Sequence, residues 1–470
     1  MKLPYPFDGR LVMIGFGCIG RGVLPLLLRH IDMQPGQLLV ISPDEEDATV
    51  AAGFQVPFKV LRLTEENHRA ELDSLLGAGD FLLNLSVQVE SAALIALCQE
   101  RGTLYLDTCT EPWAGSYTVP SQSPSERSNY ALRERTLARR RGDAGGSTAL
   151  ITHGANPGLV SHLLKQALLD LAADLGQPQA APLDRLGWAT LAQQLGVRCI
   201  HIAERDSQYG SRRKSADEFV NTWSVDGFIS EACQPAELGW GSHEKDLPPD
   251  GRRHAFGCQA AIYLERPGAA TLVRTWTPGT GPTLGFLITH SEAISIADYL
   301  TVGRGEQPEY RPTVHYAYHP CDDAVLSLHE LAARNWRPQV RQRLLNAADI
   351  EAGADDLGVL LLGHARGAYW YGSRLTIEQA RALCQHNSAT SLQVSATVMA
   401  GVIWTLVNPD RGILEPDQLP HDEILELCRP YLGELAGYYS DWTPLQDRER
   451  LFPEELDLND PWQFVNVRYR

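Results

Sequence analysis

Lysine is scarce in this chain, since only five lysines stand among its 41 basic residues. A mechanism through a Schiff-base lysine therefore has few candidate residues. Positive charge is also outnumbered, because 58 acidic residues give a formal net charge of −17. Nucleic-acid binding needs clustered positive charge, so we expect no nucleic-acid partner. The acidic balance fits simple solubility or attraction of a cationic substrate, and charge alone favours solubility.

Paired cysteines and long apolar runs are missing as well. The nine cysteines are scattered through 470 residues without a C-x-x-C pair, which fits a reduced protein better than a disulfide scaffold. The histidines lack zinc spacing, and neither H-E-x-x-H nor a Ser/His/Asp signature occurs, so we expect no metal. No signal-like segment precedes the first apolar run, and no uninterrupted apolar stretch is long enough to span a membrane. We expect a cytoplasmic protein that does not contact membranes.

A glycine-rich motif follows the first apolar run. Residues 11–14 read as a buried strand, and a helical pattern follows the motif GFGCIG. In such a motif the first glycine permits a tight turn, the second lets the backbone approach a pyrophosphate, and the third lets helix and strand pack closely. The motif predicts a dinucleotide site, although an accidental glycine turn is the alternative. The candidate cofactor-binding residues here are Gly15, Gly17, Cys18, Ile19 and Gly20.

Strands and helices alternate through residues 1–155, which predicts a parallel sheet of the Rossmann type. Asp44 follows the second strand, where an acidic residue usually binds the adenine ribose. Since no arginine lies close in sequence to hold a 2′-phosphate, NAD is favoured over NADP. A solvated acidic loop at Asp44 is an alternative of nearly equal weight. Asn84 and Thr108, at the ends of later strands, are further candidates for cofactor contact.

Residues 156–470 read as a larger α+β domain, built on a mixed sheet, for substrate binding and dimerisation. Pro157 is placed as the first residue of a helix, with Asn156 as its cap. A second helix, over 390–406, is almost wholly small and apolar, which indicates burial between layers or at a dimer seam. The helices of about 375–435 could pack back on the first domain. Strand patterns occur at 198–203, 254–264, 284–289, 313–318 and 358–362.

Carboxylates and a few other polar side chains gather at the ends of predicted elements. Glu111 follows a strand of the first domain, where a nicotinamide should lie. If the carboxylates converge beside Trp223, the pocket is polyanionic with an aromatic wall, which suits an organic ammonium. Each carboxylate has a solvated surface position as its alternative, and Asn156 has a helix cap. The candidates are Glu111, Asn156, Glu204, Trp223, Glu231, His290 and Glu292.

Seven segments resemble the bacterial homospermidine synthase family, in family order and along almost the whole chain. They are GFGCIGRGVLP, YLDTCTEPW, THGANPGLVSHL, HIAERDSQ, FVNTWSVDGF, PAELGWGSHE and LITHSEAISI. The wider superfamily is that of saccharopine dehydrogenase-like proteins, in which a Rossmann domain carries an appended α+β domain. The resemblance implies a homodimer with tightly held NAD.

The resemblance also implies a reaction. Enzymes of this family oxidise putrescine to an imine, lose ammonia, add a second putrescine and reduce the new imine, which gives sym-homospermidine without net redox change. By the same resemblance Trp223 stabilises cationic species and Glu231 binds an ammonium deep in the pocket. The remaining implied roles are reaction-centre positions for Glu111, Asn156 and Glu204, polar partners or proton carriers for His290 and Glu292, and amine binding for Asp355.

Two rival hypotheses remain at the level of the sequence. A simple NAD(P)-dependent oxidoreductase, of the saccharopine or carboxynorspermidine reductase kind, needs an exchangeable cofactor and arginines for substrate carboxylates. A non-catalytic NAD-sensing protein on the same fold would be expected to lack the pocket carboxylates, which are present here.

Overall fold

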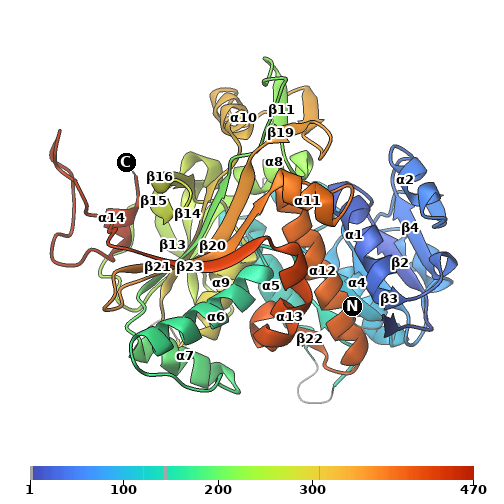
Figure 1. The fold of residues 1–470 in the computed structure, drawn as a ribbon, viewed down its shortest axis with the longest axis horizontal. Helices are drawn as coiled ribbons and strands as arrows, with labels where there is room; N and C mark the ends of the chain where they lie inside the picture. Colours follow the sequence, from blue (N-terminus) through green and yellow to red (C-terminus); the bar gives the residue numbers. More distant parts are fainter. Residues whose placement is uncertain (1–3, 120, 141–144, 306, 470) are drawn as a thin grey trace.

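Two sheets organise the chain, and a layer of helices separates them (Figure 1). The structure is a computed structural model that describes residues 4–119, 121–140, 145–305 and 307–469. In Figure 1 the first sheet lies within the blue N-terminal part, and the second occupies the green, yellow and orange part.

The first sheet has seven strands in the order β22-β8-β7-β6-β2-β4-β5, and every pairing is parallel. This confirms the predicted Rossmann-type sheet. One edge strand comes from far along the chain, because β22 pairs with β8. The strands are β2 Leu11–Ile14, β4 Leu38–Ser42, β5 Phe58–Val60, β6 Phe81–Asn84, β7 Leu104–Asp107, β8 Ala149–Leu150 and β22 Ile413–Leu414.

Two of the helices in this part of the chain, α1 and α4, were predicted from the sequence, whereas α2, α3 and α5 were not. The helix after the glycine motif begins at Cys18, and α4 ends because Gly102 takes the left-handed conformation, φ 71°. The helices are α1 Cys18–His30, α2 Ala48–Gly53, α3 His68–Asp73, α4 Ser91–Arg101 and α5 Asn129–Leu137.

The second sheet has ten strands and is mixed, as predicted. Its main path runs β13-β14-β12-β17-β9-β20-β21-β23, with β16 beside β17 and β15 beside β16. β17 and β9 are parallel, whereas β9 and β20 are antiparallel. The strands are β9 Cys199–Asp206, β12 Pro235–Gly239, β13 Gly251–Arg253, β14 Ala261–Pro267, β15 Leu272–Thr277, β16 Gly281–Phe286, β17 Thr313–His319, β20 Ala354–Leu362, β21 Ala368–Thr376 and β23 Glu434–Ser440.

Smaller elements complete the fold. Three two-stranded pairs join β1 Tyr5–Pro6 to β3 Ile31–Asp32, β10 Tyr209–Gly210 to β19 Ile350–Ala352, and β11 Glu218–Asn221 to β18 Arg341–Leu344. The later helices are α6 Leu159–Asp174, α7 Arg185–Gln194, α8 Val225–Cys233, α9 Ser291–Tyr299, α10 Asp322–Ala333, α11 Ile377–Leu383, α12 Ala389–Val407, α13 His421–Cys428 and α14 Phe464–Val467. Short 3-10 turns lie at Pro35–Gln37, Ser116–Thr118, Pro124–Arg127, Gly268–Ala270, Pro416–Gln418 and Arg429–Tyr431.

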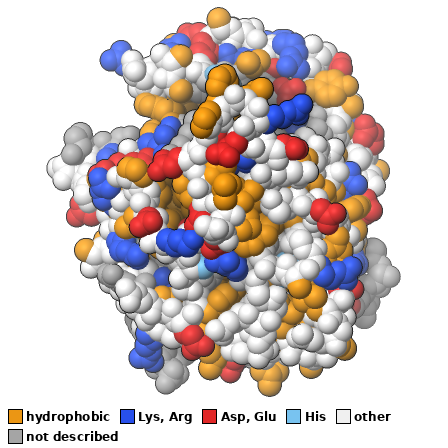
Figure 2. Space-filling model, turned by 90° about the vertical axis from the view of Figure 1, so that its left-hand side faces the viewer, with side chains coloured by type: hydrophobic (Ala, Val, Ile, Leu, Met, Phe, Trp, Pro, Cys, Tyr) orange, Lys and Arg blue, Asp and Glu red, His pale blue; other side chains and the backbone are white. Residues whose placement is uncertain are grey.

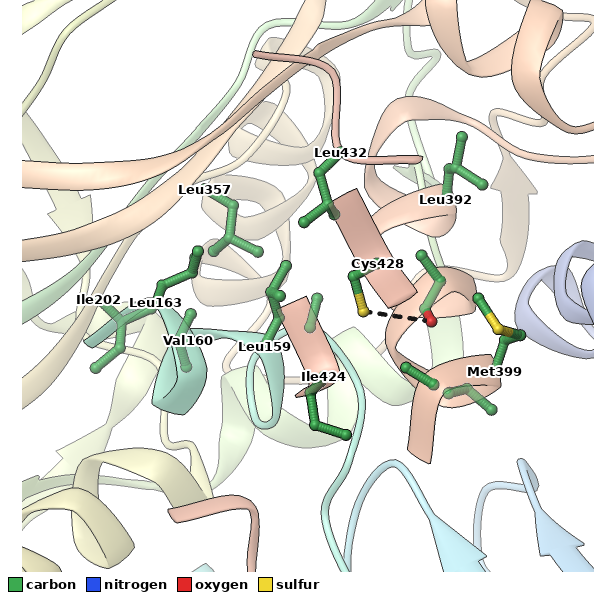
Figure 3. Close-up of a cluster of buried hydrophobic side chains, with 14 of the residues drawn as sticks. Leu159, Val160, Leu163, Ile202, Leu357, Leu392, Met399, Ile424, Cys428 and Leu432 are labelled. Atoms are coloured by element: carbon green, nitrogen blue, oxygen red, sulfur yellow. Dashed lines mark hydrogen bonds between the residues drawn. The ribbon is translucent and has the colours of Figure 1, made fainter. Parts of the chain in front are cut away.

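The α12 helix is the core element between the two sheets. It packs against α1 on one side and α13 on the other. By length and composition α12 could cross a membrane, which the sequence analysis did not anticipate, but 83% of its apolar window is buried inside the protein. Figure 3 shows its neighbours, including Leu159 of α6 and Leu357 of β20, and the sulfur of Cys428 pointing at the carbonyl oxygen of Ala396 at 3.5 Å. The apolar composition of α12 therefore reflects burial between layers.

Two local predictions are wrong. The helix expected at Pro157 begins at Leu159, with Gly158 at its N-cap. The reason is a tight fold of the preceding loop, because a Cβ on Gly158 would lie 2.0 Å from the carbonyl oxygen of Gly154. Asn156 is thus no cap, and its side chain is free for other contacts. The strand expected over 254–264 is interrupted, since β14 begins only at Ala261.

The face of the molecule shown in Figure 2 carries intermingled acidic and basic side chains with several hydrophobic patches. The excess negative charge of the sequence is therefore not gathered into one field on this face.

Candidate active site

The glycine motif forms a turn that has room for a phosphate. Gly15 has φ 88°, and a Cβ there would lie 2.6 Å from the carbonyl oxygen of Leu85. A Cβ on Gly20 would lie 2.7 Å from the carbonyl oxygen of Gly15, so helix α1 packs closely on the strand. A Cβ on Gly17 would meet no atom within 4 Å. Gly17 is the N-cap of α1, where free backbone N–H groups attract anions. The chain thus fits the pyrophosphate of a dinucleotide at this turn.

A cleft of about 770 Å³ opens in front of this turn. Its wall includes residues from the second part of the chain, among them Ser224 at the start of α8. Of the predicted cofactor residues, Gly15, Gly17, Cys18, Ile19 and Asp44 line the cleft.

The other three predicted cofactor residues do not line the cleft. Gly20 packs behind the turn. Asn84 is buried, with its side-chain oxygen accepting from the Ser86 hydroxyl at 2.6 Å. Thr108 lies against the loop at Gly154.

The end of the cleft near strand β4 is acidic. Asp44 is exposed and accepts a hydrogen bond from the backbone N–H of Glu46. Asp47, which the sequence analysis did not single out, also lines the cleft and forms an ion pair of 2.9 Å with Arg21 of α1. Arg62 lines the cleft as well, whereas Arg21 is engaged by the Asp47 carboxylate.

Glu204 is the central carboxylate of the second sheet. It lies on β9, is 2% exposed, and its Oε2 accepts hydrogen bonds from Asn156 Nδ2 at 2.8 Å and from the Tyr316 hydroxyl at 2.5 Å. Burial raises the pKa of Glu204 to about 7, and Asp206 adds to the shift. The group can therefore gain or lose a proton near neutral pH.

His290 lies between two carboxylates. Its Nε2 is 3.1 Å from Oε2 of Glu231, and its Nδ1 is 3.2 Å from Oε1 of Glu292. Burial lowers the pKa of His290, but the two carboxylates outweigh burial and hold it well above the usual range. The imidazole is therefore a proton donor held in place from both sides.

Glu111 brings a carboxylate from the Rossmann part into the same pocket. Its Oε2 accepts from the backbone N–H of Gln88 at 3.1 Å and from the Tyr117 hydroxyl at 3.3 Å. Burial raises the pKa of Glu111 to about 7, and the negative charge of Glu231 contributes. Glu111 and Glu231 therefore lie near enough for their charges to interact.

Trp223 connects the cleft with the carboxylates. It directly precedes Ser224, which lines the cleft, and its Nε1 donates to the Tyr318 hydroxyl at 3.1 Å. Tyr318 lies beside Glu204 in the register of β17 and β9. The indole is half-buried and packs against the ring of Phe228, with centroids 5.1 Å apart.

Asp355 lies one strand further, on β20. It is opposite Asp206 in the antiparallel register of β9 and β20, and both are fully buried. Burial raises the pKa of Asp355 well above its usual range, and Glu204 and Asp206 add to the effect. These three carboxylates therefore share one region of the sheet.

All eight predicted catalytic positions thus belong to one connected region. Sequence reasoning missed four of its members, which are Tyr117, Asp206, Tyr316 and Tyr318. For the strand residues a signal was present, since Glu204 and Asp206 alternate on β9, as Tyr316 and Tyr318 do on β17, and so share a face. Among the described residues, no group of three or more His, Cys, Asp or Glu side chains is arranged to hold a metal ion.

Known proteins match this chain along almost its whole length. Residues 11–150 match the saccharopine dehydrogenase NADP binding domain, and residues 154–440 match the saccharopine dehydrogenase C-terminal domain. A homospermidine synthase from Blastochloris viridis is 53% identical over 467 residues, which cover 98% of each chain. One from Mesorhizobium japonicum is 48% identical over 468 residues, covering 98% of this chain and 96% of that one.

A solved structure extends the likeness to three dimensions. The crystal structure of homospermidine synthase from Legionella pneumophila in complex with NAD has a TM-score of 0.93 and 47% sequence identity, and the match covers 99% of each chain. The chain therefore belongs to the homospermidine synthase family, within the saccharopine dehydrogenase-like proteins.

Proposed function

We propose that this enzyme joins two putrescine molecules into sym-homospermidine, with release of ammonia and with NAD as a cofactor that is regenerated in each turnover. The observation that carries the proposal is the convergence of buried carboxylates beside the nucleotide cleft. Glu231 and Glu292 hold His290 from both sides, and Tyr316 lies between this histidine and Glu204. Glu111 lies close enough to Glu231 for their charges to interact.

The charge of the pocket supports a diamine as substrate. Buried carboxylates are costly unless a cation compensates them. Glu111 and Glu204 respond with pKa values of about 7, so they hold protons in place of a cation. A diamine carries two ammonium groups, which can replace these protons and complete the charge-assisted hydrogen bonds. A substrate with its own carboxylate would instead be repelled.

NAD, when bound, supplies hydride acceptance from an amine carbon and hydride return to an imine. The chain's own task is to handle protons and charge around that step. An ammonium must first lose a proton, and Glu204 accepts it, because its pKa of about 7 suits a base at neutral pH. Asn156 holds Oε2 of this carboxylate through its hydrogen bond of 2.8 Å.

The opposite end of the diamine stays charged and must be anchored. Glu231 binds that ammonium, and the ring of Trp223 adds cation–π attraction. His290 holds its proton between Glu231 and Glu292 and supplies it to the nitrogen that leaves as ammonia. The family resemblance assigns amine binding to Asp355, which is buried beside Asp206 further along the sheet.

Cofactor contacts follow from the cleft. The backbone at Gly15, Gly17, Cys18 and Ile19 holds the pyrophosphate, and Asp44 together with Asp47 binds the adenosine ribose. Family membership supports two functional units, at 1–155 and 156–470, with the helices of about 375–435 packed on the first, a homodimer, and a cytoplasmic location. Light scattering after gel filtration tests the dimer.

Incubation of the purified protein with putrescine and catalytic NAD tests the function. We expect homospermidine and ammonia by chromatography without net NADH. If NADH accumulates and homospermidine is absent, the protein is a plain dehydrogenase. If NAD binds but putrescine is not consumed, the NAD-sensing alternative holds.

A further inference from the structure

Tyr316 contacts two residues of the proposed proton transfer, Glu204 and His290, but has no assigned role in it. It lies on β17 and is 3% exposed. Its hydroxyl donates to Oε2 of Glu204 at 2.5 Å. Its ring centroid lies 4.5 Å from that of His290, with the planes tilted by 37°. No motif of the sequence pointed to this residue.

The hydrogen bonds of Glu204 converge on one oxygen. Oε2 accepts from Tyr316 and, at 2.8 Å, from Asn156, which lies on the loop before α6. Donors from two separate elements fix the rotation of the carboxylate about its last bond. Because both donors hold Oε2, Oε1 is the oxygen left for a substrate nitrogen, and its position depends on both donors.

The ring of Tyr316 has a second role. His290 uses both ring nitrogens, in the plane of the imidazole, for Glu231 and Glu292. The phenol covers a face of that imidazole and is itself backed by Tyr318, at 5.1 Å and 10° between planes. The imidazole is thus fixed in its plane by carboxylates and out of its plane by Tyr316.

We infer that Tyr316 is a positioning residue that holds the proton-accepting oxygen of Glu204 and the imidazole of His290 in a fixed position relative to each other. The inference rests on the proposed function. It assigns to Tyr316 an effect on the rate of the proton-transfer steps, rather than on the binding of putrescine or NAD. A tyrosine that merely fills the core would affect stability alone.

The test compares Tyr316→Phe with Tyr310→Phe. Tyr310 is also a buried tyrosine, but its hydroxyl donates to the backbone oxygen of Val197 at 2.7 Å, near the other end of β9. Both variants lose one buried hydroxyl and keep the ring. We expect Tyr316→Phe to lower kcat by about tenfold or more, as for a hydrogen bond to a charged group, with a much smaller change in KM. Tyr310→Phe should keep the wild-type kcat.

The pH profile separates positioning from packing. The hydroxyl of Tyr316 stabilises the ionised form of Glu204, so its loss raises the pKa of that carboxyl. The acid limb of the kcat/KM profile should therefore move to higher pH in Tyr316→Phe. Asn156→Ala, which removes the other donor to Oε2, should move the limb in the same direction. Neither shift is expected in Tyr310→Phe.

A wild-type rate and profile in Tyr316→Phe would overturn the inference, as would equal losses in the two tyrosine variants. If Tyr316→Phe fails to fold, an unshifted acid limb in Asn156→Ala overturns the inference and a shifted one supports it. Wild-type protein assayed in parallel separates the test of the proposed function from the test of Tyr316. Absence of homospermidine in that sample counts against the proposed function, whereas an active wild type with an unaffected variant counts against Tyr316 alone.

Discussion

Putrescine binding should release protons from this protein, because its pocket holds protons where the substrate will place positive charge. Glu111 and Glu204 both have pKa values raised to about 7, chiefly by burial. A bound dication lowers both pKa values again, since opposite charge favours the ionised carboxylate. The protons then pass to the solvent.

The expected number follows from the two pKa values. At a pH of about 7 each carboxyl is roughly half protonated, so the pair holds about one proton, and binding releases about one proton per diamine. At a pH of about 8 the pair holds only about 0.2 protons, and release nearly disappears. At a pH of about 6 the number of protons released per diamine approaches two. The release should therefore fall steeply across the neutral range.

Titration calorimetry in buffers of different ionisation enthalpy measures this number. The protein is loaded with NADH, so that putrescine binds without being oxidised. In Glu111→Gln the number of protons released per bound diamine at neutral pH should fall by about half a proton. Glu244→Gln is the matched control, because burial also raises the pKa of Glu244 to about 7, but its partners are Thr313 and the backbone of Phe464. Binding heats that are identical in all buffers at neutral pH would refute the reasoning.

Further variants separate cofactor binding, substrate binding and stability. Gly17→Ala should keep the wild-type melting temperature and lose NAD affinity, because a Cβ there meets no protein atom within 4 Å. Gly15→Ala should lower the melting temperature, because its Cβ would lie 2.6 Å from a backbone oxygen. Calorimetry and NAD titration distinguish the two variants. Trp223→Ala should lower kcat/KM by roughly 30-fold and Trp223→Phe by less, with NAD binding retained, and full activity in Trp223→Ala would contradict the cation–π role. Glu237→Gln should lower the free energy of unfolding by about 1–3 kcal/mol in urea titrations. The Glu237 carboxylate accepts hydrogen bonds from the backbone N–H groups of Asn129 and Tyr130, and an amide NH2 group cannot accept both. An unchanged urea midpoint would show that these hydrogen bonds contribute little.

The parallel sheet was predictable from local pattern. Short apolar runs alternate with helical periodicity, and each glycine of the motif has a steric role that the structure bears out. The edge strand β22 was not predictable, because Ile413–Leu414 is only two residues long and carries no periodic signal. Its place beside Ala149–Leu150 depends on packing between segments far apart in the chain.

The helix start near Pro157 shows how a close backbone contact overrides a local signal. Asn156 and Pro157 match the usual residue types for a cap and a first helical position. The approach of Gly158 to Gly154 leaves no room for that geometry, and α6 begins at Leu159. The same contact releases the amide of Asn156 to reach Glu204. Of the two readings that the sequence allowed for Asn156, the structure excludes the helix cap.

Residue types at strand ends sufficed to nominate the carboxylates, but their mutual arrangement depends on register. Glu204 meets Tyr318 only because β17 and β9 pair in parallel with those residues opposite each other. Asp355 meets Asp206 through the antiparallel pairing of β20 with β9. Tyrosines on a buried strand read as core in a single sequence, so the alternation of Tyr316 with Tyr318 was the only signal for Tyr316.

Charge explains how one pocket can carry out both half-reactions without losing the intermediate that links them. In the proposed cycle water adds to the imine and displaces ammonia, and the resulting aldehyde fragment still carries the ammonium at its other end. That ammonium stays within reach of Glu231, whose partner His290 is fixed by Glu292. Release of the fragment would break the charge-assisted hydrogen bond between this ammonium and the carboxylate. The acidic pocket therefore retains the fragment until a second amine arrives, and a redox-neutral cycle needs this retention as much as it needs the cofactor.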